Sequence, residues 1–451
     1  MTPDPTEPLG DWRSFARRRY RPFRLLAVAQ GFIGPLAGPA IVIPLLLSLG
    51  AHPALATILA VLPVLGTMGQ RLLPNLLDRT NGNLRGLVVV GATVAEPRGL
   101  LLAGIVALNA TGIASDAVTI ALVALVVGFF GSIGAIAYGS LQSWYQIILP
   151  DAERRVIGPR LAGIALGIGS IVLLPLALGM DDLVSGIGIW AYAVPFGVSG
   201  VAGLIPAIAL RRIPSPGRVR VPRQAPWAQD EDDRLRGLAR VLTLASLAAG
   251  LAPFLAVYAI AVLGTGPGFA IALSAISSGT LVLASLVVSS RLARSSASRM
   301  LRASMLLRGV ALLLGLAAHP ANPYAAAVLV VIAVAMAAGD TAGQLSANER
   351  LFRLATGPEV IAFQSHFVVR YVLAYGGGLL GGSAVMLMGG YPAFAILFGG
   401  AGLVRLTASR FTGAPSRSQI GTTTEVHRTV QVPPAEARDE GPSGTPDETP
   451  G

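Results

Sequence analysis

Four charged residues lie inside stretches of this sequence that are otherwise apolar. Glu96 and Arg98 flank Pro97 in GATVAEPRGLLLAG, Asp340 lies in AMAAGDTAGQLSANERLF, and Arg370 lies in QSHFVVRYVLAYGGGLLGG. A charge at the centre of a membrane-spanning helix costs about 2.5–3.5 kcal/mol, so four unpaired charges would cost on the order of 10 kcal/mol. We therefore expect these groups to be paired, either as ion pairs that hold helices together or as groups that couple proton movement to transport.

The spacing of these charges suggests how they pair. Glu96 and Arg98 are two residues apart, about 200° around a helix, so they face opposite ways unless Pro97 distorts the turn. Each then needs a partner on another helix. Asp340 and Arg370 lie on consecutive antiparallel segments, and we predict that they pair directly. For Glu96, Arg98 and Arg370 a structural role and a coupling role remain open, whereas for Asp340 we favour coupling.

A set of neutral polar residues accompanies these charges. Gln344 follows Asp340 at i+4, so the two share one helix face. Gln30 precedes two Gly-Pro pairs in AQGFIGPLAGPAIVIP, a pattern that favours a bent helix. Together with Gln142 and His366, these glutamines form the predicted substrate cavity. Helix packing near Gln30, interfacial solvation of Gln142 and an ordinary buried polar role for His366 are the alternative explanations.

The composition sets the class of protein. Of 451 residues, 53% are hydrophobic and only 13% are charged, against about 25% charged in a soluble domain. Apolar runs of 18 or more residues recur, each long enough to cross a bilayer. The sequence therefore predicts an all-α polytopic protein of the cell membrane (inner or plasma membrane), with the lipid bilayer as its surroundings. It contains no cysteine and no recognisable metal cluster, nucleophile motif or phosphate loop, so we expect neither an enzyme nor a cofactor.

Apolar runs between loop signals predict twelve transmembrane helices. The six of the first half are 25–49, 53–70, 86–108, 117–141, 160–178 and 187–210. The six of the second half are 241–263, 268–290, 303–318, 324–348, 362–388 and 391–408. The ninth is short for a span unless its arginine-bearing start is included.

The arginines predict the orientation. The net charge is +11, and all 34 basic residues are arginine. All except Arg98 and Arg370 lie before the first span, near links that follow even-numbered spans, or towards the C-terminal end; Arg308 is counted with the arginines around the link between spans eight and nine, and Arg405 with those from there to the C-terminal end. Positive residues mark the cytoplasmic side, so both termini are predicted to be cytoplasmic. We read the positive charge as a topology signal, with no nucleic-acid partner.

The predicted spans divide the chain into five parts. A basic cytoplasmic arm (1–24) precedes a six-helix bundle (25–210), and a cytoplasmic loop (211–240) connects it to a second six-helix bundle (241–408). The arm either lies along the membrane surface or serves as a positive flank that fixes orientation. The tail, 409–451, is rich in Pro, Gly, Thr and Glu, a composition that predicts disorder.

Twelve spans in two halves, with a long basic central loop, resemble the major facilitator superfamily of secondary transporters. The family's link between spans two and three usually reads G-x-x-x-D-R-x-G-R/K; here PNLLDRTNGNLR keeps Asp78 and Arg79 but has Pro74 at the leading glycine. The resemblance implies that Asp78 and Arg79 help to lock the cytoplasmic gate. The family's antiporter motif in span five is not matched by GPRLAGIALGIG. The resemblance also implies a solute site near the midplane that is exposed alternately to each side.

Two function hypotheses follow. The first is an alternating-access secondary transporter, acting as a monomer, that moves a small organic solute, is coupled to protons and favours export. Its transport and coupling residues would be Asp340, Glu96, Arg98 and Arg370. The alternative is a non-transporting membrane scaffold or sensor on the same fold.

Overall fold

A computed structural model describes residues 20–149, 151–213, 215, 218, 233–250, 254–292, 296–354 and 358–412. Most of the predicted arm and nearly all of the predicted tail lie outside these residues, as does most of the central loop. The side chains of Gln142 and His366 also lie outside the described part. All described helices belong to one compact unit, Met1–Gly413.

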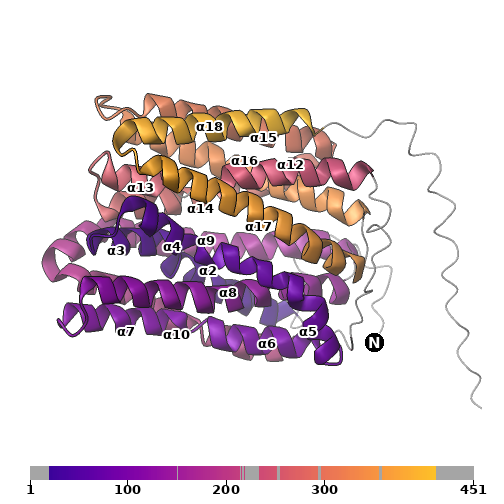
Figure 1. Cartoon of the computed structure of the whole chain (residues 1–451). Coiled ribbons are helices and arrows are strands. Elements are labelled where there is room, and N and C mark those ends of the chain that lie inside the picture. The colour runs from indigo at the N-terminus through magenta and orange to yellow at the C-terminus, as the bar shows by residue number, and fades with distance from the viewer. Residues whose placement is uncertain are drawn as a thin grey trace, which may run out of the picture. The chain divides into compact units, whose positions relative to one another are not determined.

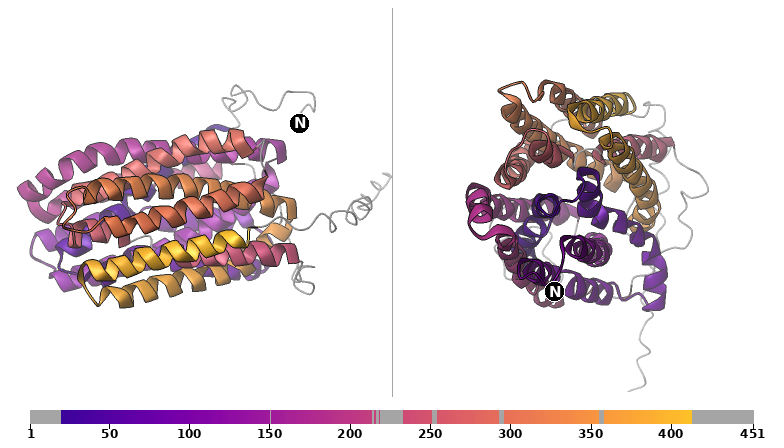
Figure 2. Two further views of the ribbon diagram at one scale, coloured as in Figure 1. Left: turned by 90° about the horizontal axis from the view of Figure 1, so that it is seen from above. Right: turned by 60° about the vertical axis from the view of Figure 1, so that its left-hand side comes forward.

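The described residues form helices and no strands, which confirms the predicted all-α class (Figure 1). The elements before the central loop, here called the N-terminal group, are α2 (Arg21–Leu36), α3 (Pro39–Ser48), α4 (Pro53–Gly66), η2 (Thr67–Leu72), α5 (Leu73–Arg79), α6 (Leu84–Ala95), α7 (Arg98–Ala110), α8 (Asp116–Ile148), α9 (Asp151–Ile187), η3 (Gly188–Tyr192), α10 (Ala193–Ala202) and α11 (Ile205–Arg211). Those after it, the C-terminal group, are α12 (Asp233–Ala249), α13 (Phe254–Ala261), α14 (Pro267–Leu292), α15 (Ala297–Leu314), η5 (Gly315–Ala317), α16 (Ala325–Leu354), α17 (Pro358–Met386) and α18 (Gly390–Arg410). The right-hand view of Figure 2 shows the two groups side by side.

Eleven helical segments among the described residues are long and apolar enough to cross a membrane. One of them, Arg160–Arg211, has 52 residues and covers the predicted fifth and sixth spans. At 1.5 Å per residue this is far longer than a hydrocarbon core of about 30 Å, and its helix α9 ends at Ile187 before η3 and α10 begin. The count of twelve stays a prediction. The helical segment that contains the predicted ninth span starts earlier, at Ala297, and α12 begins at Asp233, inside the predicted loop.

Proline interrupts two of the spans. The first segment divides between α2 and α3, where Gly38 precedes Pro39; a methyl group on Gly38 would lie 2.4 Å from the carbonyl oxygen of Gly34, so only glycine fits this bend. The third segment divides at Pro97, between α6 and α7. Proline lacks the N–H that a continuous helix needs, and both breaks follow from that property.

Two seams bring the groups together. Helix α9 packs against α14 along one seam, and α17 packs against α4, η2 and α5 along the other. Across the first seam, Ser170 Oγ donates a hydrogen bond to the carbonyl oxygen of Ala275 at 2.9 Å, and Asp181 Oδ1 accepts one from the backbone N–H of Gly268 at 2.8 Å. Because Gly268 lies in the first turn of α14, this carboxylate satisfies a backbone donor that the helix itself leaves unpaired.

Among the described residues, the cores of the two groups merge at one end. One cluster of buried apolar residues runs through both groups and includes Met180, Tyr192, Tyr258 and Phe394, near the arginine-free links. Near the arginine-rich links the clusters are separate: one lies in the N-terminal group around Trp144, and another in the C-terminal group (Leu238, Val241, Ala245, Leu301, Met305, Ala408). The apolar core that the two groups share therefore lies towards the arginine-free end.

Candidate functional site

The strongest concentration of buried charge lies in the C-terminal group. Arg308 on α15 donates a hydrogen bond from Nη1 to Oδ1 of Asp340 on α16, forming an ion pair. The side chain of Arg308 is only 7% exposed, whereas that of Asp340 is 39% exposed. The pair therefore has a buried positive end and an accessible negative end.

Two glycines on α16 make room for this pair. A methyl group on Gly339 would lie 2.5 Å from Cγ of Arg308, and one on Gly343 would lie 2.9 Å from its Nη2. Gly343 also faces Ser304, whose hydroxyl donates to the carbonyl oxygen of Gly339 at 2.7 Å. Helices α15 and α16 thus approach closely, because small residues at the contact let the long arginine lie flat between them.

A second arginine lies beside the pair. Arg405 on α18 is 1% exposed, and its Nη1 lies 3.8 Å from Sδ of Met305. Nη2 of Arg308 lies 3.3 Å from the same sulfur. The two guanidinium groups therefore converge on one thioether, which is a weak and uncharged acceptor. Two arginines share this region with one carboxylate.

These residues line a cavity of about 310 Å³, here called the C-terminal cavity. Its lining residues belong to α12, α15, α16, α17 and α18. Its wall is apolar except for the charged residues and a few neutral polar groups; it includes Leu238, Leu242, Ser246, Gln344, Phe367 and Tyr371. The structure thus brings Asp340 and Gln344 together in one cavity.

The N-terminal group holds the other buried acid. Glu96 is 1% exposed and lies at the break between α6 and α7, where Pro97 lets Glu96 and Arg98 reach the same neighbour, Gly134 on α8. A methyl group on Gly134 would lie 3.3 Å from Nη1 of Arg98 and 3.9 Å from Oε1 of Glu96. Tyr138, one turn further along α8, lies close enough to Glu96 to interact electrostatically with it. The expected divergence of the two charges is therefore removed by the proline.

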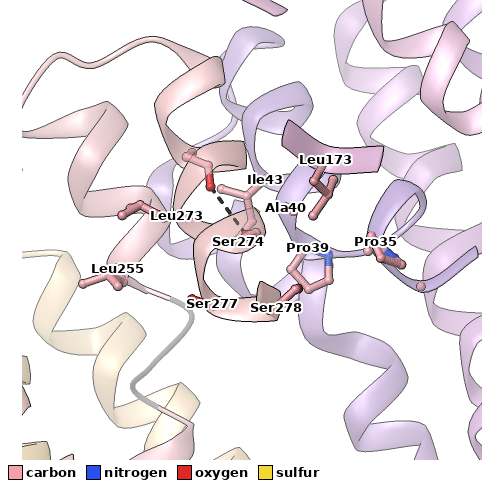
Figure 3. Close-up of a pocket in the computed structure, with 14 residues that line it drawn as sticks. Pro35, Pro39, Ala40, Ile43, Leu173, Leu255, Leu273, Ser274, Ser277 and Ser278 are labelled. Carbon is pink, nitrogen blue, oxygen red and sulfur yellow. Dashed lines mark hydrogen bonds between the residues drawn. The ribbon is translucent and has the colours of Figure 1, made fainter. Parts of the chain in front are cut away.

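A second cavity, of about 430 Å³, lies between the two groups. Figure 3 shows its lining: the Gly-Pro bend of the first span with Pro35 and Pro39 on one side, and a serine row on α14 on the other. The row consists of Ser274, Ser277 and Ser278. No charged residue is among those that line it, so this serine-lined cavity offers hydroxyl groups and apolar surface.

The other predicted site residues are more dispersed. Gln30 on α2 is partly buried, and its Nε2 has no acceptor among the described residues. Asp78 and Arg79 end α5 with exposed side chains, and α5 packs against α17. Arg370 lies on α17 with an exposed side chain.

One predicted pairing is wrong, and two residues were missed. Asp340 was expected to pair with Arg370, but its hydrogen-bonded partner is Arg308. Arg308 and Arg405 had been counted with the topology-setting arginines around a cytoplasmic link and at the C-terminal end, whereas both are buried within helices. A signal existed: each is followed by further apolar residues, in LLRGVALLLGL and GLVRLTA, which suit the interior of a span better than its end.

The arrangement defines a helical membrane protein with two groups of helices, a cavity between them and a charged cavity in one of them. Solved structures with a similar arrangement of helices include the following transporters. A POT family transporter in complex with a thioalcohol-conjugated peptide aligns with a TM-score of 0.63 at 12% identity, over 86% of this chain and 94% of that one. A bacterial homologue of the iron transporter ferroportin aligns at 0.60 and 15%, over 86% and 97%. The major facilitator superfamily transporter FucP aligns at 0.55 and 13%, over 88% and 100%.

The chain therefore has the fold of the major facilitator superfamily transporters, as the sequence resemblance implied. No protein-family model and no curated protein matches the sequence. At these identities the likeness establishes the fold, and the substrate has to be argued from this chain's own residues.

Proposed function

We propose that this protein is a proton-coupled secondary transporter of a small organic solute, with Asp340 as the proton-carrying group. The observation that carries the proposal is the asymmetric pair of a buried Arg308 and a partly exposed Asp340 on the wall of a cavity. Buried acids paired with bases inside membrane helices mark ion and proton pathways. The fold supplies the alternating exposure that such a transporter needs.

The pair can couple proton binding to conformation in a simple way. Protonation of Asp340 removes its charge and weakens its bond to Arg308, because an ion pair becomes a hydrogen bond from a charged donor to a neutral acceptor. The buried guanidinium then lacks its counter-charge, which is costly in a low-dielectric interior. A state of the protein that offers Arg308 another partner becomes favoured, and this difference is what links protonation to movement.

The remaining predicted residues fit supporting roles. We place the solute first in the serine-lined cavity between the groups, and assign Gln344 to the wall of the C-terminal cavity. Glu96 and Arg98 form a second charged unit in the N-terminal group. Asp78 and Arg79 remain the proposed gate, since α5, which carries them, packs against α17 of the opposite group. We retain export, a monomer and the cell membrane as parts of the proposal.

Reconstitution tests this function. Comparison of metabolites inside and outside cells with and without the protein supplies candidate solutes, and proteoliposomes that contain a pH-sensitive dye then report proton movement when each solute is added. We expect at least one solute to move protons with wild-type protein and to do so far less with Asp340→Asn. Asp182→Asn, which alters an exposed carboxylate on α9, is the matched control.

The alternative of a scaffold or sensor predicts a different outcome. In that case no candidate solute and no protons cross the proteoliposome membrane, and Asp340→Asn leaves the cellular function intact. This combination would overturn the transporter proposal.

A further inference from the structure

The charges of the C-terminal cavity do not balance. Arg308 and Arg405 are both buried, whereas Asp340 is the single acid among the described residues that line the cavity. The only other titratable group in the lining is the hydroxyl of Tyr371. With Asp340 ionised the site carries one excess positive charge, and with Asp340 protonated it carries two.

Arg405 forms no salt bridge among the described residues; Asp340 and Tyr371 lie near enough to attract it electrostatically but are not bonded to it. Its Nη1 meets only the thioether of Met305, and its Nε has no acceptor among the described residues. The Nε of Arg308 is likewise without an acceptor in that part of the chain. An arginine that is 1% exposed and faces a weak acceptor is expensive to keep charged. Such a side chain is suited to an anion that enters the cavity.

We propose that the C-terminal cavity binds an organic monocarboxylate, with its carboxylate held by Arg405 and Arg308. The identification of this anion as the transported solute, or as one part of it, rests on the proposed function. A guanidinium group presents its donors in a planar fork that matches a carboxylate. Both guanidinium groups contact Met305, so they lie close enough together to bind one carboxylate between them.

The charge and the lining narrow the ligand class. With Asp340 ionised, a monoanion cancels the single excess charge, whereas a dianion such as a phosphate monoester would leave a buried negative charge in its place. Leu242, Phe367 and Tyr371 offer the rest of the ligand an apolar wall. Gln344 is exposed and Asp340 is partly exposed, so the cavity is open to its surroundings on the α16 side. An aliphatic or aromatic carboxylate satisfies all of these conditions.

Three carboxylates and their neutral amides test the site. Acetate, butyrate and benzoate are compared with acetamide, butyramide and benzamide, by binding of the radiolabelled compound and by thermal unfolding of the full-length protein in detergent. Wild-type protein should bind at least one carboxylate and gain thermal stability from it, while the matching amide binds at least tenfold more weakly. Arg405→Gln should lose at least tenfold in affinity for that carboxylate, and Arg405→Lys should lose less.

The same helix provides the control. Arg410 is exposed in the last turn of α18, and Arg410→Gln should bind the carboxylate like the wild type. If Arg405→Gln does not fold, the comparison of acid with amide on the wild-type protein still decides the question. Equal binding of acid and amide, no binding of any of the three carboxylates, or unchanged affinity in folded Arg405→Gln would overturn the proposal.

Carboxylate binding, compared with solute and proton flux, distinguishes the anion site from the transport function. Carboxylate binding without any solute or proton flux would leave the site standing and remove the transporter proposal. Proton-linked flux of a solute in a protein that binds no carboxylate would leave the transporter proposal standing and remove the anion site.

Discussion

The Arg308–Asp340 pair makes an asymmetric prediction about stability. Replacing Asp340 by Asn leaves Arg308, whose side chain is 7% exposed, without its counter-charge. Breaking a buried pair in this way costs about 3–5 kcal/mol. Replacing Arg308 by Gln leaves Asp340, which is 39% exposed and can be solvated within the open cavity. That loss is expected to cost about 1–3 kcal/mol, the usual range for a hydrogen bond removed from a partly buried group.

The assay is the thermal midpoint of detergent-purified protein, at one scan rate for all variants because membrane proteins of this size often unfold irreversibly. We expect Asp340→Asn to have the lowest midpoint and Arg308→Gln an intermediate one. The double variant Arg308→Met, Asp340→Leu should recover part of the stability, since it removes both charges and replaces them with apolar groups. A lower midpoint for Arg308→Gln than for Asp340→Asn would refute the assignment of the buried and accessible ends.

Three further predictions concern other parts of the molecule. Gly134→Leu should destabilise the protein by about 1–3 kcal/mol through overpacking against Glu96 and Arg98, and Gly134→Ala is the milder control. Equal thermal midpoints for Gly134→Leu and the wild type would contradict the contact of Gly134 with both charged side chains. Asp181→Ala should lower the stability of the protein by about 1 kcal/mol, because it removes the cap on the first turn of α14. The change should be measurable as faster amide hydrogen exchange in that turn, and unchanged exchange would show that the contact is dispensable. A cysteine at exposed Ser185 should be labelled from outside the cell and one at exposed Ser215 should not; the opposite labelling would reverse the predicted topology.

Most of the fold could be predicted from the composition and from the spacing of apolar residues. The apolar runs placed the first segment at 25–49, and the helices α2 and α3 occupy Arg21–Ser48. The break at Pro97 follows from a missing backbone donor, a property that is local and therefore readable in a sequence. The i+4 spacing likewise predicted that Asp340 and Gln344 would share one cavity wall.

The pairing of the buried charges could not be predicted from the sequence in the same way. Arg308 and Arg405 lie near the ends of apolar runs, where an arginine usually indicates orientation. Whether such a residue reaches water or turns inward depends on the neighbouring helix, and here Gly339 and Gly343 open the space that Arg308 fills. Pairing across helices is a tertiary property, so consecutive order in the chain gave Asp340 the wrong partner.

The most direct test of the central claim is proton-driven accumulation in proteoliposomes, measured beside exchange of the same solute at zero pH gradient. If Asp340 carries the coupling proton, Asp340→Asn should still exchange solute across the membrane but should no longer accumulate it against a gradient, while Asp182→Asn does both. Full uphill accumulation by folded Asp340→Asn would contradict the account.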